Sequence, residues 1–183
     1  SFGGVVAFEM ARQLCAAGEE VAQLVLFDSS LSRPDDTWFA APPVSHAAAR
    51  DLASAAQVFG RFTGSDIKID EAALCALPVT AQIEMVAAAF SASGTAMLQG
   101  DAGAMVAGLL AIAKAHREAR LAYLPGPCDA PITLFRAEGS PEPRWAEIAG
   151  QAVEVVPARG DHVTMMAEDN ATALAEALRG VLA

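Results

Sequence analysis

The chain has few basic residues and few cysteines, and each shortage excludes a class of protein. It carries 12 Lys and Arg against 22 Asp and Glu, which gives a formal net charge of −10. Such an acidic chain is a poor match for nucleic acid or an anionic membrane, so we expect neither as a partner. Only 19% of the residues are charged and 54% are hydrophobic, which excludes a disordered acidic tail. The 183 residues are enough for a sizeable core.

Cysteine and histidine are too sparse and too scattered for a disulfide framework or a metal site. The three cysteines, which share no Cys-x-x-Cys spacing, are Cys15, Cys75 and Cys128. We interpret them as small buried residues of a protein in the reducing cytoplasm. No two of the three histidines have the spacing of metal ligands, and no apolar run is long enough to span a membrane. We therefore expect a cytoplasmic protein without a bound metal.

Apolar periodicity predicts alternating helices and strands around a long helical insertion. A helix is expected over 4–17, and a buried strand over 21–27 that ends at Asp28. The remaining helices are expected at about 45–62, 70–76, 79–91, 102–123, 145–148 and 166–182, and the remaining strands at 132–136 and 152–156. This order indicates an α/β fold with a mostly parallel sheet and helices on both faces.

Three of these helices have a predicted apolar face. The first helix is expected to use Val5, Val6, Met10 and Leu14. The last helix of the insertion is expected to use Leu109, Ile112, Ala119 and Tyr123. The final helix is expected to turn Leu174, Leu178 and Val181 inward.

Ser1 is the first candidate for chemistry. The run Ser1-Phe2-Gly3-Gly4, followed at once by a helical pattern, matches the second half of a nucleophile elbow, Gly-x-Ser-x-Gly. Gly3 and Gly4 would let the helix pack closely behind the elbow. Serine followed by glycine is also common in ordinary loops, so the motif alone does not decide. The first half of the motif is missing and three strands make a thin sheet, so we expect further strands upstream of Ser1.

Two other strand ends carry polar candidates. Asp28 ends the first visible strand and His162 follows the last, in the order serine, acid, histidine. Ligand sites of open α/β sheets lie at the carboxyl ends of the strands. Serine needs a base to take its proton, imidazole titrates near neutrality, and a carboxylate fixes the imidazole tautomer. Singly, Asp28 could be a turn residue and His162 a surface residue; together with Ser1 they favour a catalytic triad.

Several neighbouring residues compete for these roles or support them. Glu138, which follows the strand 132–136, is an alternative acid that chain order cannot separate from Asp28. His46 and His116 fall within predicted helices of the insertion and are expected to be surface or packing residues. The backbone N–H of Phe2 would be one oxyanion donor, and the second is expected from a loop upstream of Ser1.

The residues around these candidates resemble the type I thioesterase domains of nonribosomal peptide synthetases and modular polyketide synthases. The resemblance lies in the run from Ser1 to Ala11, in Leu26-Phe27-Asp28-Ser29, and in the run from Gly160 to Met166. It implies an α/β-hydrolase fold with a core of residues 1–33 and 125–183 and a helical lid insertion over 34–124. In this family the acid follows the strand directly after the elbow helix, which favours Asp28 over Glu138.

The resemblance also implies a reaction and a partner. An acyl or peptidyl chain would arrive as a thioester on the phosphopantetheine arm of an upstream carrier domain. Ser1 would attack it with His162 as base, and water or an internal nucleophile would release an acid or a macrocycle. The domain itself would bind no cofactor.

Three alternatives stay open at this stage. A stand-alone editing thioesterase, or an esterase or lipase of the same fold, would carry the same motifs. An N-terminal-nucleophile hydrolase would use the α-amine of Ser1 as its base. A non-catalytic α/β remnant would only bind a partner. We also expect residues 1–183 alone to be inactive or poorly folded, since the strand before the elbow is missing.

Overall fold

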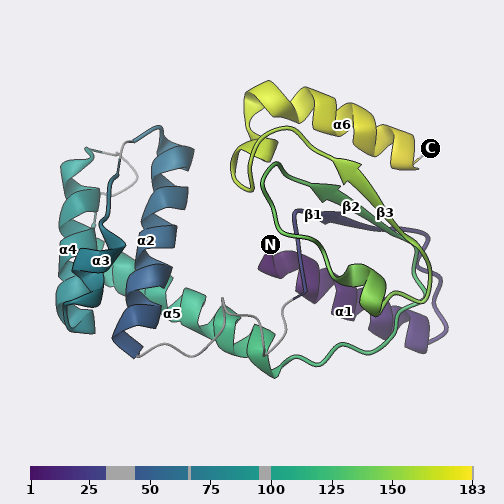
Figure 1. The fold of residues 1–183 in the computed structure, drawn as a ribbon, viewed down its shortest axis with the longest axis horizontal. Coiled ribbons are helices and arrows are strands. Elements are labelled where there is room, and N and C mark those ends of the chain that lie inside the picture. The colour runs from purple at the N-terminus through teal and green to yellow at the C-terminus, as the bar shows by residue number, and fades with distance from the viewer. Residues whose placement is uncertain (32–43, 66, 95–99, 183) are drawn as a thin grey trace. The chain divides into compact units, whose positions relative to one another are not determined.

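The computed structural model describes residues 1–31, 44–65, 67–94 and 100–182, and it divides into two compact units. One unit, here the α/β unit, comprises residues 1–33 and 122–183. The other, here the helical unit, comprises residues 34–121. The predicted start of the helical insertion, residues 34–43, lies outside the described residues. Figure 1 shows the elements of both units.

The α/β unit holds one parallel sheet of three described strands, in the order β1-β2-β3. They are β1 (Leu24–Phe27), β2 (Ile132–Arg136) and β3 (Val153–Pro157). β1 starts later than predicted because its register on β2 begins with Leu24 opposite Ile132. The predicted fold class, α/β with a parallel sheet, is confirmed, and all three strands end on one edge.

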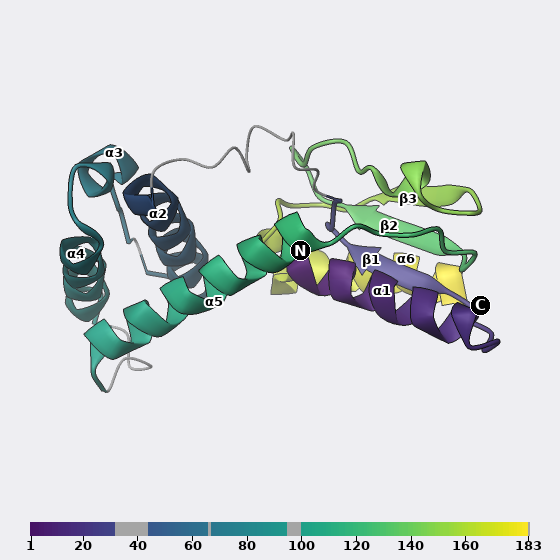
Figure 2. The same cartoon turned by 90° about the horizontal axis from the view of Figure 1, so that it is seen from below.

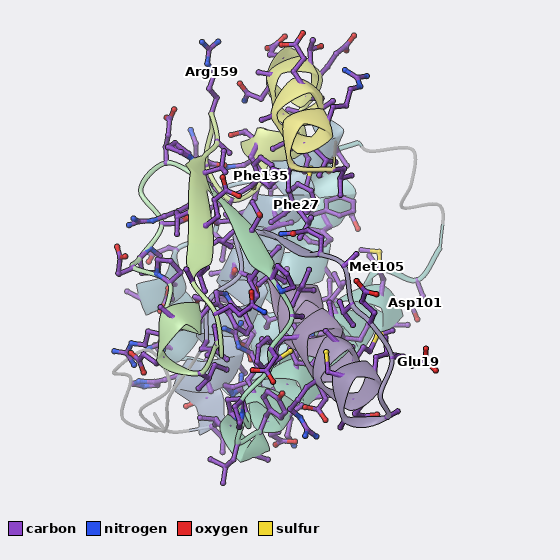
Figure 3. All side chains as sticks on the ribbon, turned by 90° about the vertical axis from the view of Figure 1, so that its right-hand side faces the viewer. Glu19, Phe27, Asp101, Met105, Phe135 and Arg159 are labelled. Atoms are coloured by element: carbon purple, nitrogen blue, oxygen red, sulfur yellow. The ribbon has the colours of Figure 1, made fainter. Side chains whose placement is uncertain are left out.

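Helices cover both faces of this sheet, and strand alternation decides which residues meet which helix. Leu24 and Leu26 of β1 share a core with α1 (Phe2–Ala16), which runs along the sheet in Figure 2. On the other face, Phe27 and Phe135 stack with ring centroids 5.4 Å apart below α6 (Glu168–Leu182), as Figure 3 shows. The predicted inward stripe of α6 is confirmed: Leu174, Leu178 and Val181 pack against this second core.

The predicted apolar face of α1 is confirmed for Val5 and wrong for the other three residues. Val5, Phe8 and Ala11 are buried against the sheet, whereas Val6, Met10 and Leu14 are exposed. The buried residues of α1 lie on a different side of the helix from most of the predicted ones. Both sides are apolar, because α1 carries apolar residues on almost every side. Periodicity alone cannot choose between two apolar faces.

In the described part of the helical unit, four helices pack around a core of their own. They are α2 (Val44–Thr63), α3 (Glu71–Cys75), α4 (Val79–Ala92) and α5, which spans Ala102–Ala122. Phe59 of α2 and Phe90 of α4 stack at 4.8 Å between ring centroids. The predicted face of α5 is wrong in part, since Ile112 is exposed and Val106 is the buried residue of that helix.

One buried amide fastens three segments of the helical unit. Nε2 of the fully buried Gln82 lies 2.9 Å from the carbonyl oxygen of Ser45 and 3.0 Å from those of Leu74 and Leu77. These carbonyls belong to α2, to α3 and to the turn before α4, so the two N–H groups of one side chain in α4 link all three segments.

Two short 3-10 turns complete the α/β unit. η2 (Trp145–Glu147) coincides with the short helix predicted over 145–148. η3 (Thr164–Met166) begins two residues after His162. None of the helices in the described ranges is long and apolar enough to cross a membrane.

Candidate active site

The N-terminus of α1 lies at the carboxyl end of β1. The backbone nitrogen of Ser1 lies 3.2 Å from the carbonyl oxygen of Phe27 and 3.3 Å from that of Asp28. The carbonyl oxygen of Ser1 accepts from the N–H of Gly4 at 3.0 Å and from Oγ of Ser29 at 2.8 Å. Ser1 is the exposed N-cap of α1, and its main chain is tied to the segment that carries Asp28.

Gly4 is the glycine that this arrangement requires. A Cβ at Gly4 would lie 2.3 Å from Oγ of Ser29, whereas a Cβ at Gly3 would meet nothing within 4 Å. The predicted close packing behind the serine is therefore confirmed for Gly4 and wrong for Gly3.

Asp28 ends β1 in a backbone conformation that is rare for residues other than glycine. Its φ is +41°, in the left-handed region that Asp tolerates better than most residues. Oδ1 accepts from the N–H of Ala137 at 3.0 Å, and Oδ2 accepts from Oγ of Ser140 at 2.7 Å. Burial alone would raise the pKa of Asp28, but the hydrogen bonds from Ser140, His162 and Ala137 outweigh it and lower that pKa.

His162 is presented by a loop that Asp161 organises. The Asp161 carboxylate accepts from the backbone N–H groups of Val163 and Thr164, both at 3.0 Å. Gly160 has φ +82°, and a Cβ there would lie 2.8 Å from Oγ1 of Thr164, so the turn needs glycine.

The structure brings Asp28 and His162 into direct contact. Nδ1 of His162 lies 2.6 Å from Oδ2 of Asp28. An ionised carboxylate can only accept, so Nδ1 carries the proton and Nε2 is left as the acceptor of the neutral ring. The alternative acid Glu138 is exposed, and its backbone N–H donates to the carbonyl of Gly160 at 2.8 Å.

Burial differs between the two members of this pair. The Asp28 side chain is 7% exposed, and the His162 side chain is 48% exposed. The carboxylate is thus fixed inside the unit while the imidazole reaches solvent, as a group that exchanges protons with a bound molecule must. Phe2, the predicted oxyanion donor, is the first residue of α1.

Two supporting residues were missed by sequence reasoning. Trp145 is fully buried against Phe8, and its Nε1–H donates to the carbonyl of Ser29 at 2.7 Å. The indole therefore anchors the segment that follows Asp28, while Oγ of Ser29 anchors Ser1. No local motif predicts these contacts, because both join segments distant in sequence.

The other two histidines lie elsewhere in the chain. His46 is in α2 and His116 in α5, both in the helical unit. Within the ranges that the structure describes, no three His, Cys, Asp or Glu side chains are grouped so that they could hold a metal ion.

A family model described as "Thioesterase domain" matches residues 1–182. The chain belongs to the thioesterase domain family. No curated protein sequence matches the chain significantly.

Solved structures of similar fold include a nonribosomal peptide synthetase and several thioesterase domains. A four-domain nonribosomal peptide synthetase, bound to AMP and glycine, matches 98% of this thioesterase domain with 14% of its own chain, at 23% identity and TM-score 0.81. The surfactin-cyclising domain SrfTE matches 97% of this chain with 64% of its own, at 18% identity and TM-score 0.58. The NocB thioesterase domain, in covalent complex with a fluorophosphonate nocardicin G analogue, matches 100% of this chain with 63% of its own, at 22% identity and TM-score 0.56.

These likenesses establish the fold, an α/β-hydrolase type of arrangement. This chain spans less than two thirds of the length of each of these three proteins.

Proposed function

We propose that this thioesterase domain releases an acyl or peptidyl chain from a carrier-domain phosphopantetheine thioester through an acyl-enzyme on Ser1. The observation that carries the proposal is the 2.6 Å contact of Asp28 with His162, at the sheet edge where α1 begins with Ser1. An acid, a base and a serine gathered at the carboxyl ends of parallel strands are the parts that acyl transfer needs.

The first step forms the acyl-enzyme. Oγ of Ser1 attacks the thioester carbonyl carbon while Nε2 of His162 takes the hydroxyl proton. The C–S bond then breaks, and the leaving thiolate receives the same proton. Asp28 stabilises the imidazolium that exists between these transfers.

The second step releases the product by the reverse sequence. Water, or an amine or hydroxyl of the bound chain, loses its proton to His162 and attacks the ester carbonyl. The proton returns to Oγ of Ser1 as the C–O bond breaks. Water yields a free acid, and an internal nucleophile yields a macrocycle.

The backbone of Phe2 supplies an oxyanion donor in this proposal. A developing negative charge is stabilised at a helix N-terminus by its N–H groups and by the helix dipole. Phe2 follows Ser1 directly and begins α1.

The helical unit is assigned the role of a lid over the substrate. Its described helices pack around a core of their own. The partner is an acyl or peptidyl carrier domain of a peptide or polyketide assembly line. This assignment rests on the peptide synthetases among the similar structures.

Two rival functions use the same residues. An editing thioesterase or an esterase of the same fold would keep the Ser1, Asp28 and His162 chemistry and would accept a different acyl donor. An N-terminal-nucleophile hydrolase would need the Ser1 amine as base, and the close Asp28–His162 pair disfavours it because the pair already supplies a base. Adding one residue before Ser1 abolishes the latter activity and leaves a triad enzyme intact.

A fluorophosphonate probe tests the proposal. The full-length wild-type domain should be labelled, and Ser1→Ala and His162→Ala should each abolish labelling. Ser54→Ala and His46→Ala, on exposed positions of α2, are the matched controls and should be labelled as wild type is. Folded wild-type protein that resists the probe would overturn the serine mechanism. Turnover of a carrier-bound acyl thioester against a simple ester then separates the thioesterase from an esterase.

A further inference from the structure

The turn after β2 grips both oxygens of the Asp28 carboxylate. Residues 137–140 form a β-turn in which the N–H of Ser140 donates to the carbonyl of Ala137 at 3.3 Å. Gly139, at the third position, has φ +75°, which a type II turn requires. The first residue donates its N–H to Oδ1 of Asp28, and the last donates its hydroxyl to Oδ2.

Arg136 fixes this turn through hydrogen bonds to the Ser140 backbone. Its Nη2 and Nε donate to the carbonyl oxygen of Ser140 at 2.7 and 3.3 Å. Nη1 of the same guanidinium donates to Oε2 of Glu142 at 3.0 Å. Ser140 is therefore fixed through its carbonyl and directs its hydroxyl to the carboxylate, so its orientation is set before any substrate binds.

Ser140 and His162 share one acceptor atom. Oγ of Ser140 lies 2.7 Å from Oδ2 of Asp28, and Nδ1 of His162 lies 2.6 Å from the same oxygen. Each donor reduces the negative charge density that the carboxylate offers to the other. The hydroxyl must therefore influence how strongly Asp28 stabilises a protonated imidazole.

From this geometry we infer that Ser140 is a positioning residue of the active site, which orients the Asp28 carboxylate and limits its attraction for protonated His162. This inference rests on the proposed function, because it assigns Ser140 a role in the reaction of Ser1 and His162. The inference also gives the turn 137–140 a function. This turn contains the alternative acid Glu138, but it supplies hydrogen-bond donors to Asp28.

The expected effect of removing the hydroxyl has a definite sign. Without the Ser140 donor, the Asp28 carboxylate becomes more basic and attracts the imidazolium more strongly. Neutral imidazole, the form that accepts the Ser1 proton, then exists only at higher pH. The acid limb of the kcat/KM profile should move upward in Ser140→Ala by about half a pH unit.

The experiment measures kcat/KM against pH with an acyl thioester of N-acetylcysteamine as substrate. We expect Ser140→Ala to lose about tenfold in kcat/KM at neutral pH, because the imidazole is less well oriented. Ser140→Thr keeps a hydroxyl and should restore the wild-type acid limb. Arg136→Met releases the turn but keeps the hydroxyl, and should move the limb in the same direction by less.

Each outcome decides between defined alternatives. An acid limb that does not move, or moves to lower pH, in both Ser140→Ala and Arg136→Met overturns the positioning role even if rates fall. Ser1→Ala is measured beside them: if it retains turnover, the proposed function fails. If Ser1→Ala is inactive and the Ser140 profiles match wild type, only the Ser140 inference fails.

Discussion

Gly4 and Ser29 approach so closely that no side chain fits between them. A Cβ at Gly4 would lie 2.3 Å from Oγ and 2.4 Å from Cβ of Ser29. Ser29 is 2% exposed, so it has no space into which to retreat. The contact matters for the site because the same Oγ donates to the carbonyl of Ser1.

Gly4→Ala should therefore displace Ser1. We expect fluorophosphonate labelling to slow about 100-fold and the free energy of unfolding to fall by about 1–3 kcal/mol. Gly3→Ala is the matched control, since a Cβ there meets nothing within 4 Å. It should label normally and be stabilised by up to about 1 kcal/mol, because alanine favours a helix. Equal labelling rates in the two variants would contradict the packing argument.

Substitutions at Asp28 and Glu138 test which of these two residues is the catalytic acid of the triad. Asp28→Asn keeps the shape of the side chain but cannot stabilise an imidazolium, so kcat should fall ~10³-fold or more. Glu138→Gln should leave kcat close to the wild-type value. The measurement is steady-state hydrolysis of an acyl thioester at neutral pH. A larger loss in Glu138→Gln would transfer the role to Glu138.

Gln82 should be essential to the helical unit. In Gln82→Leu the carbonyls of Ser45, Leu74 and Leu77 lose their shared donor. We expect the free energy of unfolding of this unit to fall by about 1–3 kcal/mol, because these carbonyls lose the hydrogen bonds from Nε2, although the Leu74 carbonyl still accepts from the N–H of Leu77. Amide hydrogen exchange in α2 and α4 measures this locally. Gln57→Leu, at an exposed position of α2, is the control and should leave exchange unchanged.

Glu9 should make the stability of the α/β unit depend on pH. Hydrogen bonds from Arg12, Tyr123 and Gln13 hold the pKa of Glu9 well below its usual range. A lowered folded-state pKa stabilises above the unfolded pKa, and this stabilisation is lost as pH falls through the folded value. The Tm difference between wild type and Glu9→Gln should thus be constant from pH 7 to about 5.5 and shrink below about 4.5.

The matched control for Glu9 is Glu118, an exposed residue of α5. Its Oε1 lies 3.8 Å from Nζ of Lys114, and both side chains are more than 60% exposed. An exposed pair of this kind contributes little to stability, so Glu118→Gln should leave Tm nearly unchanged. If the Tm difference between wild type and Glu9→Gln persists undiminished into strong acid, Glu9 stabilises the unit through packing and not through its charge.

Most helices and strands could be predicted from the sequence because their signals are local. The ends of α4 and β2 lie within a residue of the prediction. Faces were harder to predict: Met10 and Ile112 are exposed although the pattern turned them inward. A helix that is apolar on several sides has no preferred face until a partner surface selects one.

The candidate site was predicted only as a set of residue types at strand ends. Ser1, Asp28 and His162 could be nominated because a parallel sheet gathers its carboxyl ends at one edge. Their roles are still predictions. The roles of Ser29, Ser140 and Trp145 could not be found in this way, because each contributes through hydrogen bonds to distant segments.

The sequence by itself determined the order of helices and strands, the parallel sheet and the membership of the thioesterase family, because periodicity and motifs are properties of neighbouring residues. Tertiary structure alone decided that Asp28, and not Glu138, meets Nδ1 of His162. It also decided that the turn bearing Glu138 donates to Asp28 through Ala137 and Ser140. The reason is geometric: a hydrogen bond depends on separations of about 3 Å, and residues more than 100 positions apart acquire these only when the sheet forms.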